Sequence, residues 1–280
     1  MPIFCDTHAH LYLEQFDEDR SQMLQRAWDK GIKYIFLPNI DVQSLSSLYD
    51  LVALAPQQCF PMIGLHPCSV KADFEHELEQ IDSELSQKSE HFYAIGEIGL
   101  DFYWDLTHRT QQFEALEQQI TWAKKYNLPV VLHCRNSHAE VYEVIKKHND
   151  TGFSGIFHCF SGNADDAQTI VAELPNFYIG IGGVITYKKG GLEAVVEASP
   201  LNRIVLETDA PYLSPEPYRS AKNKAERRNE SAYIIEIAQK IANIKGTSIE
   251  EVAQITTQNA LRLFKWQEKQ KNKPIIALQS

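Results

Sequence analysis

The sequence contains no apolar run long enough to span a bilayer, and no basic leader followed by an apolar segment at its start. Cysteine is scarce, with five in 280 residues, an odd number in which no two are spaced as CxxC. These absences predict a cytoplasmic protein with reduced thiols, no structural disulfides and no membrane association. The five cysteines are Cys5, Cys59, Cys68, Cys134 and Cys159.

Positive charge is also in short supply, because 27 lysines and arginines face 37 acidic residues and the net charge is −10. This balance argues against a broad nucleic-acid-binding surface, but it does not exclude a nucleic-acid substrate held by local phosphate contacts. One basic cluster consists of Arg219, Lys222, Lys224, Arg227 and Arg228, with Glu226 among them. It is either a solvated loop or a contact for a nucleic-acid strand. Its place after Asp209, near the rim of the predicted pocket, favours the contact.

Short apolar runs alternate with amphipathic segments along most of the chain. The hydrophobic content of 44% and the charged content of 23% are typical of a soluble globular protein. Eight strands separated by helices predict a parallel α/β sheet, and eight is the number that closes into a (β/α)8 TIM barrel. The predicted strands are Ile3–Asp6, Tyr34–Pro38, Cys59–Gly64, Tyr93–Glu97, Val130–His133, Gly155–His158, Phe177–Gly182 and Arg203–Glu207. The predicted helices between them are Glu18–Lys30, Val42–Ala55, Glu75–Lys88, Arg109–Tyr126, Ser137–His148, Ala164–Leu174 and Leu192–Ala198.

Extra C-terminal helices are expected after the eighth strand and a long loop from Asp209 to Arg228. Asn229 is the expected N-cap of the first of them, and Ser248 with Glu251 forms a capping-box pattern for the second. A third helix is expected over Thr257–Phe264.

The domain organisation is predicted to be simple. We find no internal repeat, low-complexity tract or linker, and expect a single barrel domain over residues 1–266 with a frayed tail over residues 267–280. An open doubly wound sheet is the alternative, and it lacks the glycine-rich phosphate turn expected after its first strand.

Side chains of the kind that bind metals follow the apolar runs at the point where each predicted strand ends. They are Asp6-Thr7-His8-Ala9-His10, Glu97, His133, His158 and Asp209. The carboxyl ends of barrel strands open on one face, so residues two hundred positions apart are expected to share one pocket. Each histidine alone could be a buried structural residue. Their common placement instead favours a two-metal hydrolytic centre.

Strand geometry adds two expectations at this pocket. His8 and His10 are separated by one residue on a strand end, so both imidazoles are expected to point the same way. Cys134 and Cys159 each follow a proposed ligand directly, so strand alternation is expected to turn them toward the surrounding helices. The remaining histidines, which include His108, are expected to have packing or surface roles.

At these positions the chain resembles the TatD family of metal-dependent hydrolases, within the amidohydrolase-type barrel superfamily, over roughly Ile3 to Phe264. The matching motifs are Asp6-Thr7-His8-Ala9-His10, Gly64-Leu65-His66-Pro67, Gly96-Glu97-Ile98-Gly99-Leu100-Asp101, His133-Cys134-Arg135, His158-Cys159-Phe160-Ser161-Gly162 and Glu207-Thr208-Asp209-Ala210-Pro211. The resemblance implies a deoxyribonuclease, commonly a 3′-to-5′ exonuclease, with Glu97 bridging the ions. It implies the metal ligands His8, His10, Glu97, His133, His158 and Asp209. One departure is visible, because Asn229-Glu230-Ser231 stands where the family often has Asn-Glu-Pro.

The mechanism that we expect uses two divalent ions, which can be zinc, manganese or magnesium. We expect His8, His10 and Asp209 to hold one ion and His133 and His158 the other. Glu97 is expected to join the two ions, and Asp209 to accept the proton of the attacking water.

We expect the substrate to be DNA, as a single strand or a frayed end. His66 and Arg135 are the expected phosphate contacts, although Arg135 could instead cap a helix or form a salt bridge. Exposed bases could stack on aromatic side chains near the mouth, or these rings could serve packing alone. The aromatic candidates are Tyr103, Trp104, Tyr187 and Tyr212. No obligate protein partner is evident.

Two other functions stay open at this point. One keeps the ions but changes the bond, as in an enzyme that hydrolyses esters or cyclic amides, including the ester of charged tRNA. The other is a nucleic-acid-binding scaffold without activity, which the cost of burying unpaired charged groups disfavours.

Overall fold

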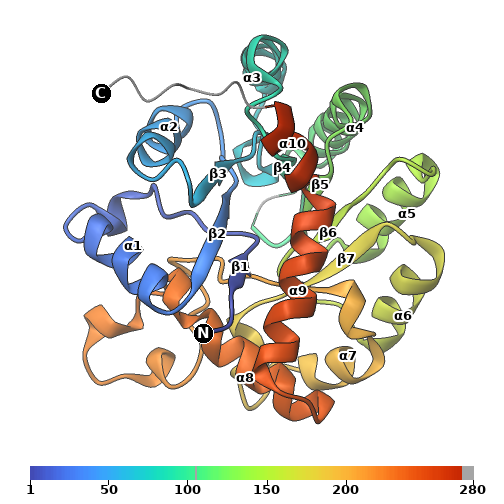
Figure 1. Cartoon of the computed structure of the whole chain (residues 1–280). Helices are drawn as coiled ribbons and strands as arrows, with labels where there is room; N and C mark the ends of the chain where they lie inside the picture. The colour runs from blue at the N-terminus through green and yellow to red at the C-terminus, as the bar shows by residue number, and fades with distance from the viewer. Residues whose placement is uncertain (105, 273–280) are drawn as a thin grey trace.

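Eight parallel strands in sequence order form the centre of the described part of the protein in this computed structural model, which describes residues 1–104 and 106–272 (Figure 1). The strands are β1 Phe4–Asp6, β2 Ile32–Leu37, β3 Cys59–Pro61, β4 Ile95–Asp101, β5 Val130–Arg135, β6 Gly155–Phe157, β7 Phe177–Ile181 and β8 Ile204–Leu206. β1 to β3 form one ladder and β4 to β8 another. A backbone bridge from Ile63 to Ile95 joins β3 to β4, and one from Ala9 to Ala210 joins the ends of β1 and β8. The ring is thereby closed, which confirms the predicted (β/α)8 barrel.

Helices separate the strands and surround the ring, and the C-terminal helix α9 runs across one end of it (Figure 1). They are α1 Arg20–Asp29, α2 Leu45–Leu54, α3 Phe74–Lys88, α4 Arg109–Tyr126, α5 His138–His148, α6 Ala164–Glu173 and α7 Leu192–Ala198, followed by α8 Ile234–Lys245, α9 Ile249–Leu263 and α10 Trp266–Asn272. Within the described residues no helix is long and apolar enough to cross a membrane.

The barrel interior is filled from the amino-terminal end by alternate strand residues. Phe36, Phe60 and Val131 belong to an apolar cluster that includes no residue of α1 to α7. Side chains of α9 and of the residue after it close this cluster, and the Phe264 ring stacks on Phe36 at a centroid distance of 3.8 Å. The opposite, carboxyl-terminal end is therefore the one left for polar side chains.

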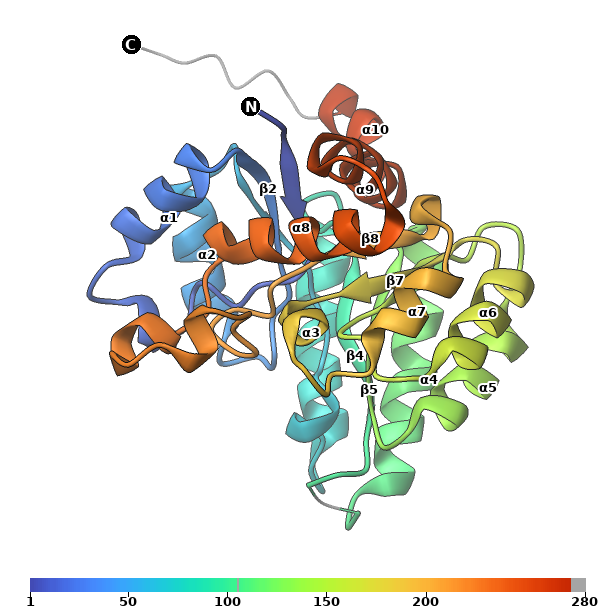
Figure 2. The same cartoon turned by 90° about the horizontal axis from the view of Figure 1, so that it is seen from below.

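Helix α9 also braces the seam between β1 and β8. The Thr257 hydroxyl donates to the carbonyl of Ile3 (3.0 Å), just before β1, and the Asn259 amide donates to the carbonyl of Ile204 (2.8 Å) in β8. Figure 2 shows the N terminus, α9 and α10 together at one end of the barrel.

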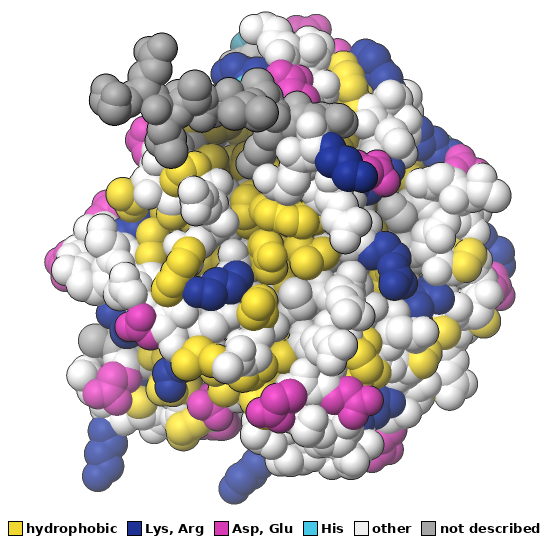
Figure 3. Space-filling model, viewed as in Figure 1, with side chains coloured by type: hydrophobic (Ala, Val, Ile, Leu, Met, Phe, Trp, Pro, Cys, Tyr) yellow, Lys and Arg dark blue, Asp and Glu magenta, His cyan; other side chains and the backbone are white. Residues whose placement is uncertain are grey.

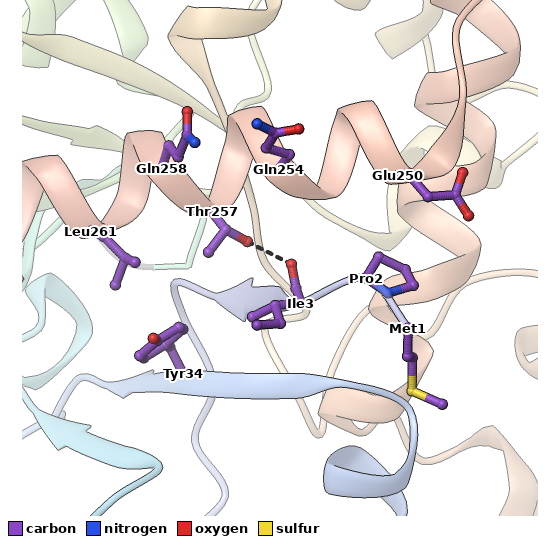
Figure 4. Close-up of a pocket in the computed structure, with 9 residues that line it drawn as sticks. All are labelled: Met1, Pro2, Ile3, Tyr34, Glu250, Gln254, Thr257, Gln258 and Leu261. Atoms are coloured by element: carbon purple, nitrogen blue, oxygen red, sulfur yellow. Dashed lines mark hydrogen bonds between the residues drawn. The ribbon is translucent and has the colours of Figure 1, made fainter.

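A cavity of about 660 Å³ lies at this amino-terminal end. Figure 4 shows its lining, which includes Met1, Ile3 and Tyr34 on one side and Leu261 of α9 on the other. Hydrophobic side chains gather around the middle of the same face (Figure 3). Because the metal-type side chains follow the carboxyl ends of the strands, this cavity is not their site.

The C-terminal helices differ from the sequence prediction in two respects. Residues 249–263 form one helix, α9, and not two; the Ser248 hydroxyl accepts from the Glu251 N–H (3.1 Å) as expected of an N-cap. Asn229 does not cap α8, which begins five residues later; its buried amide donates to the carbonyls of Thr208 and Tyr212 instead.

The expected tail lies partly outside the described residues. Of residues 267–280, those up to Asn272 belong to α10, and 273–280 are outside the described range. The Trp266 ring at the start of α10 packs edge-on against Tyr34, at a centroid distance of 5.0 Å.

Candidate metal centre

The paired histidines near the start of the chain are fixed by backbone hydrogen bonds to both neighbouring strands. The Ala9 N–H donates to the carbonyl of Phe36 in β2 (3.1 Å), and the His10 N–H donates to Ala210 beyond β8 (2.7 Å). Because alternate side chains of an extended segment leave on the same side, His8 and His10 bring their Nε2 atoms to within 3.1 Å of each other. Both rings are buried.

The Glu97 carboxylate of β4 lies at the centre of the predicted ligands. Its Oε2 is 3.2 Å from His8 Nε2 and 3.6 Å from His10 Nε2. Its Oε1 is 2.8 Å from His133 Nδ1 and 3.8 Å from His158 Nε2. Each oxygen of this buried carboxylate therefore faces its own set of imidazole nitrogens.

Asp209 approaches the same nitrogens from the end of β8. Its Oδ1 is 3.6 Å from His10 Nε2, 3.7 Å from His158 Nε2 and 3.8 Å from His8 Nε2. Burial raises the pKa of Asp209 to about 6, against the opposing effect of His158 and His10. A carboxylate with a pKa near neutrality is suited to accepting a proton from water.

In His10 and His158 the ring nitrogen that faces away from Glu97, the outer nitrogen, is bonded to a partner that fixes the tautomer. The Tyr12 hydroxyl donates to the carbonyl of Pro38 (2.7 Å), so it accepts from the Nδ1–H of His10 (3.0 Å). The Nδ1–H of His158 donates to Glu207 Oε2 (3.0 Å). When these rings are neutral, Nε2 therefore carries the lone pair and faces Glu97 and Asp209.

His133 is held from its outer side by Asp101, whose Oδ2 is 2.8 Å from His133 Nε2. The position of Asp101 is fixed in turn by the Gln112 amide, which bonds to both its N–H (2.9 Å) and its carbonyl (3.2 Å).

The close approach of β4 to β5 beside His133 requires a glycine at position 99 of β4. A Cβ at Gly99, where φ is +145°, would lie 2.0 Å from the carbonyl oxygen of His133.

His66 differs from the other imidazoles in its tautomer. Its Nδ1 accepts from the Cys68 N–H (3.0 Å), so in the neutral ring the proton is on Nε2. That Nε2–H lies 3.4 Å from Glu97 Oε1 and 3.3 Å from His133 Nδ1. His66 is thus placed as a hydrogen-bond donor beside the cluster, and not as a lone-pair ligand.

The donor set fits divalent metal ions. Four groups of described residues have ligand atoms within 4.8 Å of one another: His8, His158 and Asp209; His8, His10 and Glu97; His66, Glu97 and His133; and His158, Cys159 and Glu207. Imidazole and carboxylate donors, with outer nitrogens held by carboxylates or a hydroxyl, are the usual surroundings of zinc and related ions in proteins. Among the described residues, His8 Nδ1 is buried without a hydrogen-bond partner.

Two imidazoles hold protons strongly in the metal-free protein. Burial lowers the pKa of His133, but hydrogen bonds to Asp101 and Glu97 outweigh burial and raise it to about 9. Burial likewise lowers the pKa of His158, yet the charges of Glu207 and Glu97 raise it to about 10. Positive imidazolium charge therefore balances the buried carboxylates until a cation replaces it.

The buried carboxylate of Asp6, two residues before His8, is bonded to Ser231, the residue that departs from the family pattern. Asp6 accepts from the Thr208 hydroxyl (2.6 Å) and N–H (3.0 Å), and from the Ser231 hydroxyl (2.6 Å). Burial raises the pKa of Asp6 to about 7, against these hydrogen bonds. A proline at position 231 has no donor, so Ser231 supplies Asp6 with a hydrogen bond that the usual family residue lacks.

The structure brings together all six residues predicted as ligands, and His66 with them. Sequence reasoning missed Tyr12, Asp101 and Glu207, which hold the outer nitrogens. Asp101 and Glu207 lie inside the motifs that carried the resemblance, so the signal for these two was present. Tyr12, two residues after His10, had no comparable signal.

Arg135 lies outside the cluster, on the exposed rim at the end of β5. Its guanidinium lies 3.9 Å above the ring of Tyr103 and 5.1 Å from that of Trp104. No hydrogen bond links its side chain to another described residue. Tyr103 is 53% exposed and Trp104 69% exposed, so these rings are accessible to a ligand.

The basic cluster and the cysteines beside the ligands differ in part from the predictions. Arg228 forms ion pairs with both oxygens of Asp19 (2.7 and 2.8 Å), so it is not a free cation of the basic cluster. The Arg219 guanidinium stacks on Tyr187 at 3.8 Å. Cys134 joins the core as expected. Cys159 does not follow strand alternation, because its φ is +45°. Its sulfur consequently lies within 4.8 Å of ligand atoms of His158 and Glu207.

The sequence and the fold of this chain are similar to those of known proteins. The family model described as TatD related DNase matches residues 5–265. The metal-dependent hydrolase YabD of Bacillus subtilis is 36% identical over 93% of this chain and 98% of its own, and the 3′-5′ ssDNA/RNA exonuclease TatD of Pantoea vagans is 32% identical over the same shares. The crystal structure of YjjV, a TatD homologue from Escherichia coli, matches with a TM-score of 0.81 and 30% identity over 94% of this chain and 98% of that chain. The chain therefore belongs to the TatD family of metal-dependent hydrolases.

Proposed function

We propose that this protein hydrolyses phosphodiester bonds of single-stranded nucleic acid, as a deoxyribonuclease that works from the 3′ end. The observation that carries the proposal is the placement of Glu97, whose two oxygens face separate sets of imidazole nitrogens, two at Oε2 and three at Oε1 (2.8 to 3.8 Å). The name of the Pantoea vagans relative, a 3′-5′ ssDNA/RNA exonuclease, supports the substrate and the direction.

Two ions fit the donor atoms. His8, His10 and Asp209 would hold one, His133 and His158 the other, and Glu97 both. Zinc or manganese suits this imidazole-rich set. Magnesium prefers oxygen ligands and would favour the carboxylates of Glu97 and Asp209. When bound, such ions make hydroxide available from water near neutral pH and offset the charge that develops on phosphate oxygens.

The side chains supply proton transfer and orientation. Asp209 accepts the proton of the attacking water, because its Oδ1 lies among the Nε2 atoms of His8, His10 and His158. The Nε2–H of His66 donates to a non-bridging phosphate oxygen. Tyr12, Asp101 and Glu207 keep the ligand rings in one tautomer and orientation.

The rim supplies substrate contacts. Arg135 presents a guanidinium on the Tyr103 and Trp104 rings. A planar guanidinium suits two oxygens of one phosphate. This local contact is compatible with a net charge of −10, since it requires no broad basic surface.

The test is digestion of end-labelled oligonucleotides by protein stripped of metal, with magnesium, manganese and zinc restored separately. We expect 3′-to-5′ shortening of single-stranded DNA only after an ion is restored, faster than that of a blunt duplex. RNA, small esters and cyclic amides serve as parallel substrates. Activity that survived thorough chelation would overturn the metal mechanism. Turnover of esters or cyclic amides without cleavage of nucleic acid would overturn the substrate.

A further inference from the structure

A second cavity, of about 180 Å³, adjoins the metal centre on the side of His66 and His133. Its lining residues are Pro67, Cys68, Val70, Lys71, Asp101, Trp104, His108 and Gln112. Pro67 and Cys68 directly follow His66, and Asp101 is bonded to His133 (2.8 Å). The cavity therefore shares a wall with the proposed reaction site.

The walls of this cavity combine apolar faces with a few polar groups. Pro67 and Val70 are buried, and the exposed indole of Trp104 offers a broad flat face. Lys71 provides an ammonium group, and His108 has a buried Nδ1 with no hydrogen-bond partner among the described residues. Apolar and aromatic surface with a few convergent polar atoms is the usual lining of a site for a small planar ligand.

One carboxylate positions both the cavity and the metal centre. Asp101 Oδ1 accepts from the backbone N–H groups of Tyr103 (2.9 Å) and Trp104 (3.3 Å), while its Oδ2 bonds to His133. The loop that carries the indole is thus fixed relative to a proposed metal ligand. Arg135 lies against both rings of this loop and adds a cation beside them.

The size of the cavity limits what can enter it. At roughly 30 Å³ per water molecule, it holds the equivalent of about six waters, which is room for one flat heterocycle. A base that is still paired would have to bring its partner strand with it, and the cavity has no room for both.

From these observations we infer that the cavity between Trp104 and Pro67 binds one unpaired base, that of the nucleotide next to the scissile phosphate. This inference rests on the proposed function and adds a source for its preference for single strands. Trp104 stacks on the base, and Lys71 and His108 contact its polar edge. Arg135 holds the neighbouring phosphate.

The experiment compares Trp104→Ala with wild-type protein on oligothymidylates that carry a single abasic nucleotide at each of the last three 3′ positions in turn. Base–aromatic stacking is worth about 1–3 kcal/mol. We therefore expect one abasic position to raise the wild-type KM about tenfold, with kcat little changed. Trp104→Ala should raise the KM of the intact strand by a similar factor and should lose the difference between intact and abasic strands. Trp104→Phe, which keeps a flat ring, should retain most of the difference.

Trp28→Ala is the matched control, because Trp28 is a partly exposed tryptophan of α1 that contacts Lys33. It should behave as wild type, and melting temperatures should confirm that both alanine variants fold. If Trp104→Ala kept the preference for an intact base, the inference would be wrong.

Binding separates this result from failure of the proposed function. Dissociation constants for the same strands, measured by fluorescence anisotropy with calcium in place of the activating ion, report base recognition without turnover. Base-dependent binding that Trp104→Ala abolishes supports the cavity even if no strand is cut, in which case the proposed activity fails. Cleavage and binding that are both indifferent to an abasic nucleotide overturn the cavity and leave the activity intact.

Discussion

The two ends of the barrel differ in almost every chemical respect, although the same eight strands build both. The amino-terminal end is filled by rings such as Phe36 and Phe60 and is closed by Phe264 after α9. The carboxyl-terminal end gathers imidazoles and carboxylates around Glu97. The amino-terminal end stabilises the fold and holds none of the proposed catalytic groups. The carboxyl-terminal end gathers charged groups, and removing them from water costs folding free energy. The difference predicts that mutations at the two ends separate stability from activity.

The largest effect is expected from Phe264→Ala at the amino-terminal end. Phe264 is fully buried against Phe36, so its loss should reduce the free energy of unfolding by about 3–5 kcal/mol. Urea denaturation measures this change. The rate of hydrolysis per folded molecule should stay within twofold of wild type. A selective fall in that rate, with the fold intact, would mean that the two ends are coupled.

Asp209→Asn is the converse change at the carboxyl-terminal end. The amide keeps the shape but cannot accept a proton, so we expect turnover to fall by about 10²-fold or more while the thermal midpoint is unchanged or raised. Asp17→Asn, at an exposed carboxylate paired with Arg20, is the control and should retain full turnover. Unchanged turnover in Asp209→Asn would remove Asp209 from the role of base.

Glu207→Gln tests whether the surroundings of the ligands matter as much as the ligands. The Glu207 carboxylate accepts hydrogen bonds from His158 Nδ1–H and from the Cys159 N–H. A Cβ at Gly180 would lie 2.7 Å from this carboxylate, so only a glycine at position 180 leaves room for Glu207. Loss of the charge should weaken metal affinity about 10–100-fold, as measured by competition with a fluorescent chelator. Glu193→Gln, at an exposed carboxylate paired with Lys240, should have no effect. Equal affinities in the two variants would limit Glu207 to packing.

The pH dependence of metal uptake sharpens the comparison further. The pKa values of His133 and His158 are raised to about 9 and about 10, so below pH 9 both rings carry protons that a cation must displace. Affinity should therefore fall with falling pH, by about tenfold per pH unit for each proton released. Titration calorimetry in two buffers of different ionisation enthalpy counts those protons between pH 6 and 8. Uptake without proton release would mean that other residues bind the ion.

The barrel was predictable because its signals are local and repeated. Each apolar run has the length of a strand, and Arg109–Tyr126 and Leu192–Ala198 match the observed helices at both ends. The C-terminal helices were less predictable. Ser248 looked like a separate start and Thr257–Phe264 like a separate helix, whereas packing of one continuous α9 against β1 and β8 decides the outcome.

The site was predictable as a set of residues but not as a set of hydrogen bonds. Strand-end placement identified the residues that meet around Glu97. It could not indicate that Cys68 fixes the tautomer of His66, or that Arg135 lies on the Tyr103 ring, because both depend on loop conformations. Asn229 illustrates the same limit, since a residue typical of a helix cap instead supports the carbonyls that follow β8.

The seam where the barrel closes runs through the metal centre itself. Ala9 and Ala210 form the backbone bridge that closes the barrel. His8 and His10 flank Ala9, Asp209 precedes Ala210, and backbone hydrogen bonds join the two segments. A chain still emerging from the ribosome lacks one side of this seam until residue 210 has been made. Complete coordination of an ion by His8, His10 and Asp209 consequently requires that the first and last strands have met.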